Sequence, residues 1–263
     1  MIKFFRQIRI ILLTDGKFSK YLLYAIGEIM LVVIGILIAL QINNWNEEKI
    51  NRTEIKLNLE NLADAIIKDD ELLREIEGNN EFRLISLQHL LRLINVDTHE
   101  ADTIAGNLNS QRIWNGAIPD TFNLEFNQKT FTWINRPRAM IIHDYAMEEF
   151  KSTGSYSQLK NQKLKNLLSD YYSALDWHFG SDGISNSSLQ DLNDYIRDTY
   201  SFLMSDIPGL RDPIAFIKND PALVVRLREV KDNASWRLTG AIKGRTMARR
   251  VLEEIETEIS SYK

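Results

Sequence analysis

The sequence predicts an all-α protein, in which an N-terminal transmembrane helix continues into a periplasmic helical bundle with long, antiparallel, coiled-coil-like helices. Three observations favour this fold class. An apolar run near the N-terminus is long enough to cross a bilayer, apolar residues recur at helical spacing through most of the chain, and the C-terminal pattern is the most regular. Residues 121–134 differ, because the alternation of their apolar residues is compatible with a small β-hairpin.

The composition is that of a folded protein, with 263 residues of which 44% are hydrophobic and 26% are charged. The chain has no cysteine, which excludes disulfides and thiolate metal sites. Its net charge of −4 combines a basic segment at residues 1–20 with an acidic remainder. This acidic body argues against nucleic acid as a partner.

The apolar run extends from Leu22 to Ile42, and thirteen of its residues are Leu, Ile or Val. A helix of this length spans roughly 30 Å, the thickness of the hydrocarbon core of a bilayer. It is also longer than the apolar region of a signal peptide, about 7–15 residues, and no A-x-A cleavage site follows it. We therefore expect an uncleaved anchor with the lipid bilayer as a partner. Aromatic and basic residues expected at the membrane interfaces are Tyr21, Tyr24, Trp45, Lys17 and Lys20.

The basic residues that precede the run predict its orientation. Lys3, Arg6 and Arg9 lie before it, so the positive-inside rule places the N-terminus in the cytoplasm. Residues 1–20 are then a cytoplasmic segment, either an interfacial helix or merely a basic flank. The expected location is the inner (cytoplasmic) membrane, crossed once. The remaining predicted regions are a transmembrane helix at 21–45 and a periplasmic helical domain at 46–263.

Glu28 is the one acidic residue within the apolar run, and it shares a helical stripe with Val32, Gly35 and Ala39. A charged residue near the helix centre costs about 2.5–3.5 kcal/mol, whereas each Leu, Ile or Val returns about 0.3–0.6 kcal/mol, so insertion remains favourable. Small residues allow a second helix to approach. We therefore expect association of the helix, as a homo-oligomer or with another membrane protein. A merely tolerated polar residue and a proton or ion relay are the alternatives.

The pattern beyond the membrane predicts several helices. A stalk helix from Asn46 to Glu77 continues the transmembrane helix, and the Gly78-Asn79-Asn80 sequence interrupts it as a bend or a turn before a helical pattern resumes at 82–94. Pro137 is expected to begin a helix that reaches Thr153 and is closed by Gly154. Further helices are expected at 159–179, at 187–204 and from Pro221, where Asp220 is the cap.

The last helix has a seam of apolar residues spaced three or four apart over about 35 residues. Such a seam fits an antiparallel or intersubunit coiled coil, with the stalk helix as the partner. Arg245 interrupts the apolar residues, either as a register-setting polar contact or as a side chain that snorkels to the edge. The seam comprises Leu227, Val230, Ala234, Leu238, Ala241, Arg245, Ala248, Leu252, Ile255 and Ile259.

The sequence contains no recognised catalytic, cofactor or metal motif, so we expect neither an enzyme nor a cofactor, and no ligand is indicated. His143 is expected on a helix, and the Asp69-Asp70-Glu71 run is expected to be a solvated face. One aromatic cluster either lines a pocket or, as is commoner for such residues on helices, belongs to the core. This cluster comprises Tyr171, Tyr172, Trp177 and His178.

The segment FSKYLLYAIGEIMLVVIGILIALQINNWNEE, with its Gly27-Glu28 pair and Asn43-Asn44-Trp45 exit, resembles the N-terminal hallmark of a Bacteroidota family of single-pass membrane proteins of unknown function, domain of unknown function 6090. Two other segments, FKSTGSYSQLKNQKLKNLLSDYY at 150–172 and the NDPALVVRL start of the last helix, are also similar to the family. Residues 96–136 depart from its pattern. The resemblance implies a helical, periplasm-facing inner-membrane protein and supplies no activity.

Three functions are compatible with these features. The leading hypothesis is a scaffold or accessory subunit that assembles through its transmembrane helix. The alternative is a periplasmic ligand sensor that signals through a partner membrane protein, and the third is an enzyme of unrecognised class. A closed bundle without a cavity favours the scaffold, whereas a polar pocket among residues 96–180 favours the sensor.

Overall fold

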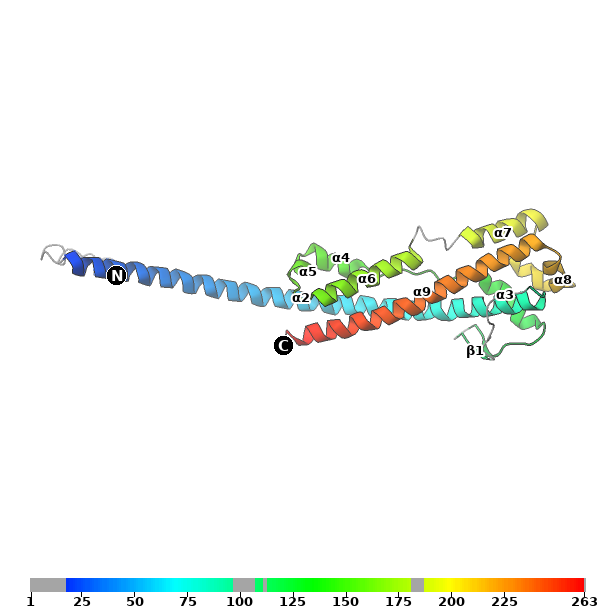
Figure 1. Cartoon of the computed structure of the whole chain (residues 1–263), viewed down its shortest axis with the longest axis horizontal. Helices are drawn as coiled ribbons and strands as arrows, with labels where there is room; N and C mark the ends of the chain where they lie inside the picture. Colours follow the sequence, from blue (N-terminus) through cyan, green and yellow to red (C-terminus); the bar gives the residue numbers. More distant parts are fainter. Residues whose placement is uncertain (1–17, 97–106, 111–112, 181–186, 263) are drawn as a thin grey trace. The chain divides into compact units, whose positions relative to one another are not determined.

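The computed structural model describes residues 18–96, 107–110, 113–180 and 187–262, and it confirms the all-α fold class. The chain divides into two compact units, Met1–Ile55 and Lys56–Lys263. Helix α2 (Phe18–Leu93) contributes residues to both units (Figure 1). The Gly78-Asn79-Asn80 sequence is neither a bend nor a turn, because α2 continues through it. Asn80 remains compatible with the helix because its side-chain amide donates to the Ile76 carbonyl, 2.8 Å away.

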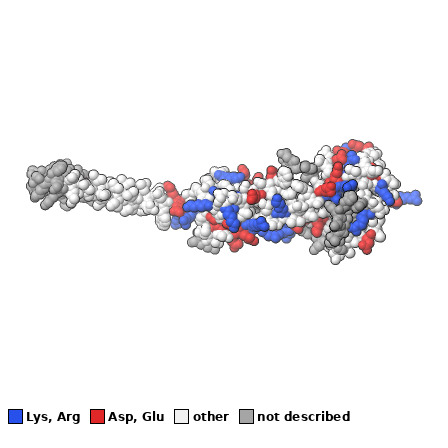
Figure 2. Space-filling view, viewed as in Figure 1, with Lys and Arg blue, Asp and Glu red and all other residues white. Residues whose placement is uncertain are grey.

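In the first unit, the described part is the first half of α2, and its surface is apolar. The Leu, Ile and Val side chains from Leu22 to Ile42 are between 43% and 77% exposed. Figure 2 shows this part of the helix as an uncharged stretch on the face in view. This is the reverse of a helix in a water-soluble domain, which buries an apolar stripe and exposes charges.

The core of the second unit is built on α9 (Pro221–Ser260) and α6 (Gln162–Phe179), which pack on the second half of α2 (Figure 1). Glycines on α9 allow the close approach. A Cβ atom on Gly244 would lie 3.0 Å from Leu73 of α2 and 3.1 Å from Leu175 of α6, so only a residue without a side chain fits there without displacing a neighbour.

Helices α2 and α9 run antiparallel. Gly244 of α9 faces Leu73 of α2, while the earlier part of α9, with Leu227, shares a core cluster with Leu87 further along α2. Six residues of the predicted seam are buried: Leu227, Val230, Ala234, Ala241, Ala248 and Ile255. Since Leu238, Leu252 and Ile259 are partly exposed, the seam only partly coincides with the buried face, and coiled-coil packing stays a prediction.

Shorter helices complete the core at the end of α2 that carries Leu87, Leu90 and Leu91. Their hydrophobic side chains form one cluster with the start of α9. These elements are α3 (Leu124–Ile134), α7 (Ser187–Tyr200), the 3-10 helix η1 (Met204–Gly209) and α8 (Pro213–Lys218). The helix predicted at 187–204 therefore ends earlier than expected and is followed by η1.

The predicted β-hairpin at 121–134 is wrong, because helix α3 occupies this segment. Asn123 caps the helix by accepting from the Phe126 N–H at 2.9 Å, and Phe126, Thr130 and Ile134 are buried at a helical spacing of four residues. The alternation of Phe122, Leu124 and Phe126 suggested a strand, but it covers too few residues to override the cap. A strand pair does occur upstream, where β1 (Asn107–Asn109) pairs antiparallel with β2 (Asn115–Ala117).

The helix predicted to begin at Pro137 is also wrong in its start, since α4 spans only Tyr145–Ser152. The preceding residues, 136–144, form an irregular segment. The predicted end is confirmed, because Gly154 has φ +77° and stands between α4 and α5 (Ser155–Gln158). His143 consequently lies outside any helix, which corrects a second expectation.

Arg245 connects α9 to α2 through ion pairs instead of snorkelling to the edge. Its Nε lies 3.1 Å from Asp70 Oδ1 and its Nη1 lies 2.7 Å from Glu77 Oε2. The guanidinium side chain is 19% exposed, so the pairs are shielded from water on most sides. A residue that interrupts the predicted apolar seam therefore makes a polar contact between the two longest helices.

Asp220 organises the start of α9, as predicted from the Asp-Pro pair. Its carboxylate accepts from the N–H groups of Ala222 and Leu223, both at 3.1 Å, and from the hydroxyls of Tyr195 and Tyr200. Burial alone would raise the pKa of Asp220, but the hydrogen bonds from Tyr200, the Leu223 N–H and Tyr195 outweigh it and hold the pKa below its usual value.

We predict that Asp220→Ala lowers the free energy of unfolding of the second unit by about 2–3 kcal/mol, because it removes a cap and the acceptor for two tyrosines. Urea unfolding of the full chain in detergent, followed by tryptophan fluorescence, measures this loss. Asp212→Ala is the matched control, since Asp212 caps the short helix α8 with a single bond to the Ala215 N–H. Its expected cost is about 1 kcal/mol or less.

The same pair of variants has a predicted pH dependence. An acid whose pKa falls on folding contributes stability above its unfolded pKa, near 3.8, and loses it as the pH falls through the folded value. The difference in the free energy of unfolding between wild type and Asp220→Ala should therefore be largest near neutral pH and should decrease below about pH 4. A difference that grows on acidification would contradict the assigned hydrogen bonds.

Candidate functional site

The residues predicted to associate in the membrane lie on an open face of α2. Val32 is 55% exposed, Gly35 and Ala39 are exposed, and Glu28 is partly exposed. A Cβ atom added to Gly27 or Gly35 would meet no atom within 4 Å. The described part of the chain therefore leaves room beside this stripe for a second helix.

The predicted membrane-interface residues are only partly described. Tyr24 is partly exposed and Trp45 is 66% exposed on α2. Lys20 and Tyr21 lie within α2. The remaining residues of this group, Lys3, Arg6, Arg9 and Lys17, lie outside the described residues.

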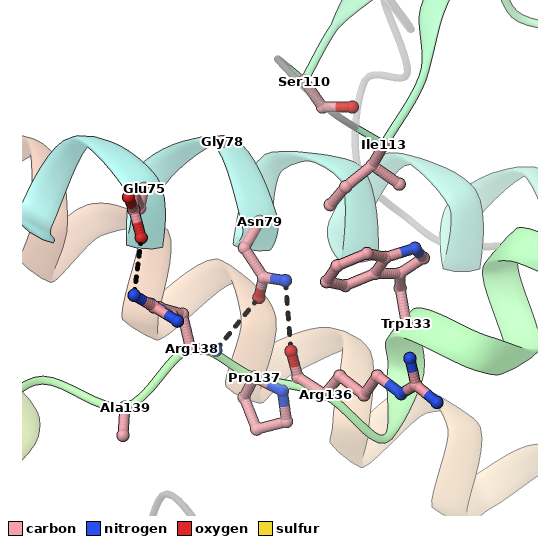
Figure 3. Close-up of a pocket in the computed structure, with 10 residues that line it drawn as sticks. All are labelled: Glu75, Gly78, Asn79, Ser110, Ile113, Trp133, Arg136, Pro137, Arg138 and Ala139. Atoms are coloured by element: carbon pink, nitrogen blue, oxygen red, sulfur yellow. Dashed lines mark hydrogen bonds and ion pairs between the residues drawn. The ribbon is translucent and has the colours of Figure 1, made fainter.

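The second unit contains a pocket of about 370 Å³ beside α2. Figure 3 shows the lining: the middle of α2, Ser110 and Ile113 between β1 and β2, the end of α3 and the irregular segment that follows α3. Aliphatic and aromatic side chains line it together with charged ones. The lining residues are Glu75, Gly78, Asn79, Ser110, Ile113, Trp133, Arg136, Pro137, Arg138 and Ala139.

Asn79 fixes one wall of this pocket by binding a backbone that is not helical. Its side-chain amide donates to the Arg136 carbonyl at 3.1 Å, and its Oδ1 accepts from the Arg138 N–H at 3.3 Å (Figure 3). Arg237 of α9 donates to the Arg138 carbonyl at 2.7 Å from the other side. These bonds satisfy the polar groups of the segment that a helix from Pro137 would otherwise have paired.

The charges on the pocket wall are unequally paired. Arg138 forms an ion pair with Glu75 at 2.9 Å, so these two charges compensate each other. Arg136 is exposed, and no hydrogen bond or ion pair of its guanidinium occurs within the part of the chain that the structure describes. The wall therefore offers one cation that is available to a ligand.

Asp69 corrects the expectation of a solvated acidic face, because its side chain is completely buried. Its Oδ1 accepts from the His143 backbone N–H at 3.0 Å and contacts His143 Nδ1 at 2.7 Å, while its Oδ2 accepts from the Tyr171 hydroxyl at 3.1 Å. Burial raises the pKa of Asp69 in spite of these bonds. The carboxylate therefore ties α2 to α6 and to the segment before α4.

The four residues of the predicted aromatic cluster differ in how far they are buried. Tyr171 and His178 are buried, Tyr172 is partly exposed and Trp177 is 70% exposed. The His178 ring packs against Trp236 of α9 with centroids 4.6 Å apart, and burial lowers the pKa of His178. None of the four lines the pocket in Figure 3.

The pocket residues were not identified from the sequence. They come from three separate segments between Glu75 and Ala139, and no local motif joins them. The one local signal was Pro137, which suggested the first turn of a helix. Among the described residues, no group of three or more His, Cys, Asp or Glu is placed to hold a metal ion.

The comparisons with known proteins give one match. The model of a family of unknown function, DUF6090, matches residues 28–96. Over that range the chain is similar to this family, and the matched range begins at Glu28 and includes most of α2. No curated protein and no solved structure matches the chain. Within the described residues, α2 is the one helix that is long and apolar enough to cross a membrane.

We predict that Asp69→Ala lowers the free energy of unfolding by about 2–4 kcal/mol, because it leaves the Tyr171 hydroxyl and the His143 N–H without an acceptor. Urea unfolding of the full chain measures the change. Asp144→Ala is the control, since Asp144 is exposed and its side chain makes no capping bond to α4. If both variants lose the same free energy of unfolding, the buried contacts of Asp69 make no specific contribution to stability.

Proposed function

We propose that this chain is a single-pass inner-membrane protein with its N-terminus in the cytoplasm and a periplasmic helical domain. It acts as a scaffold or accessory subunit that assembles, through its transmembrane helix, with itself or with another membrane protein. The exposed apolar surface of α2 between Leu22 and Ile42 carries this proposal. The family match supports a membrane protein of unknown function and adds no activity.

The energetic argument concerns where this apolar surface can be stable. Transferring one large aliphatic side chain from water to an apolar phase gains roughly 1.5–3 kcal/mol, and α2 exposes such side chains along its whole apolar run. A bilayer removes all of them from water at once. The basic residues before the run then favour a cytoplasmic N-terminus.

Association through the helix is supported by the stripe that contains Glu28. Gly35 and Ala39 are small, so a second backbone can approach closely on this face, and the Glu28 carboxyl gains a polar partner there. Ionisable residues within transmembrane helices are rare and usually face a neighbouring helix or a polar cavity. The same stripe therefore supplies both the space and the polar group for a contact between helices.

We predict that Gly35→Leu and Glu28→Leu each weaken assembly of the full chain by about tenfold, because a contact between transmembrane helices is worth about 1–2 kcal/mol. Chemical crosslinking after mild detergent extraction measures the assembled fraction. Gly27→Leu is the matched control. Gly27 also has open space around it but lies off the stripe.

The proposal of assembly through this face is overturned if wild type is a monomer without a crosslinked partner. It is also overturned if Gly35→Leu and Gly27→Leu behave identically. Loss of assembly in Gly27→Leu alone would overturn it as well, because it would assign the contact to a different face of the helix.

A periplasmic ligand sensor is the second candidate, and the pocket in Figure 3 favours it. The pocket includes residues of the 96–180 region together with Glu75, Gly78 and Asn79 of α2. A ligand that contacts α2 would shift the helix between two arrangements, and Glu28 would carry the change to a partner in the membrane.

A further inference from the structure

The pocket in Figure 3 has the features of a ligand site and not of a packing defect. Its volume of about 370 Å³ lies within the range of small-molecule pockets. One of its walls, the segment at 136–138, is held by directed hydrogen bonds, since Asn79 and Arg237 both bind the backbone of this segment. A site whose walls are fixed in this way loses little entropy when a ligand enters.

The electrostatic character of the pocket is positive. Glu75 and Arg138 neutralise each other, which leaves the exposed guanidinium of Arg136 on the wall. Arg237, whose Nη2 binds the Arg138 carbonyl, is a second guanidinium immediately behind this wall. Cations with low-dielectric protein behind them attract anions more strongly than cations that are surrounded by water.

Arg83 adds a further positive charge that is wholly buried. Its Nη1 donates to Asn80 at 2.7 Å, but its Nε and Nη2 have no hydrogen-bond partner among the residues that the structure describes. Burial, together with the charge of Arg237, lowers the pKa of Arg83 to about 9, so the side chain is still charged at neutral pH. Arg83 is close enough to Arg237 for that charge to affect its pKa, and Arg237 in turn binds the Arg138 carbonyl of the pocket wall.

The remaining lining is mostly apolar and includes one indole ring. In Figure 3 the Trp133 indole lies just below Ile113 on the right, and Pro137 and Ala139 lie along the lower side. The indole of Trp133 favours a planar apolar group, because such a group can stack on the ring at a small entropic cost. Ser110 is already engaged with Trp114, so Arg136 is the main polar contact that the wall offers.

We infer that this pocket binds a small organic carboxylate carried on a flat apolar group, with Arg136 contacting the carboxylate and Trp133 contacting the flat group. The site goes beyond the membrane assembly proposed above and does not depend on it. It supplies a ligand class for the second candidate function, the sensor.

Three isosteric probes test the inference: benzoate, which is anionic, benzamide, which is neutral, and benzamidine, which is cationic. Ligand-observed NMR titrations of the full chain in detergent give the dissociation constant of each. We expect benzoate to bind about tenfold or more tightly than the other two, because a charge-assisted hydrogen bond to a guanidinium is available only to the anion.

Variants separate the two contacts. Arg136→Met roughly keeps the length of the side chain. It should weaken the binding of benzoate by about tenfold and leave the affinity for benzamide unchanged. Trp133→Leu should weaken all three probes alike. Arg211→Met is the matched control, since Arg211 is exposed and does not line the pocket, and it should have no effect.

The inference is overturned if benzoate does not bind, if it binds no more tightly than benzamide, or if Arg136→Met and Arg211→Met give the same affinity. Since Arg136 is exposed, its replacement should leave the urea midpoint unchanged, and Arg136→Lys should retain part of the affinity. These outcomes are independent of the crosslinking of Gly35→Leu. Failure of ligand binding and failure of membrane assembly are therefore distinguished.

Discussion

Water solvates the apolar surface of α2 between Leu22 and Ile42 only at a large cost in free energy, and this constraint governs the first unit. Every Leu, Ile and Val side chain in that range is exposed, and no other element among the described residues covers it. A bilayer removes the cost and leaves Glu28 as the one acid within the apolar run. The polar group and the small residues beside it then become the features that a neighbouring helix can recognise.

The second half of α2 is constrained differently, because it is buried and reaches the rest of its unit through polar side chains. Asp69 binds His143 and Tyr171, Asn79 binds the segment after α3, and Asp70 binds Arg245. These contacts fix helices and one irregular segment relative to the same stretch of α2. The pocket lies where that irregular segment meets α2, so its walls depend on directed bonds more than on helix packing alone.

Features that depend on neighbouring residues were predictable from the sequence. The apolar run, the Asp220 cap of α9 and the Gly154 terminus are local patterns, and the structure contains each of them. The predictions that were wrong concern residues whose binding partners are distant in the sequence. Residues 137–144 are not helical because their backbone binds side chains far away in sequence, as when His143 binds Asp69 at a separation of 74 residues. Burial of Asp69 and assembly of the pocket depend on such contacts, which periodicity does not encode.

The most direct test of the account is the topology of α2 in a membrane. The chain has no cysteine, so single cysteines introduced as Thr14→Cys and Lys160→Cys report their own accessibility to a membrane-impermeant maleimide. In right-side-out inner-membrane vesicles, we expect Lys160→Cys to react at once and Thr14→Cys to react only after detergent is added. Equal reaction of both positions in intact vesicles, or recovery of the chain in the soluble fraction, would contradict a membrane-spanning α2.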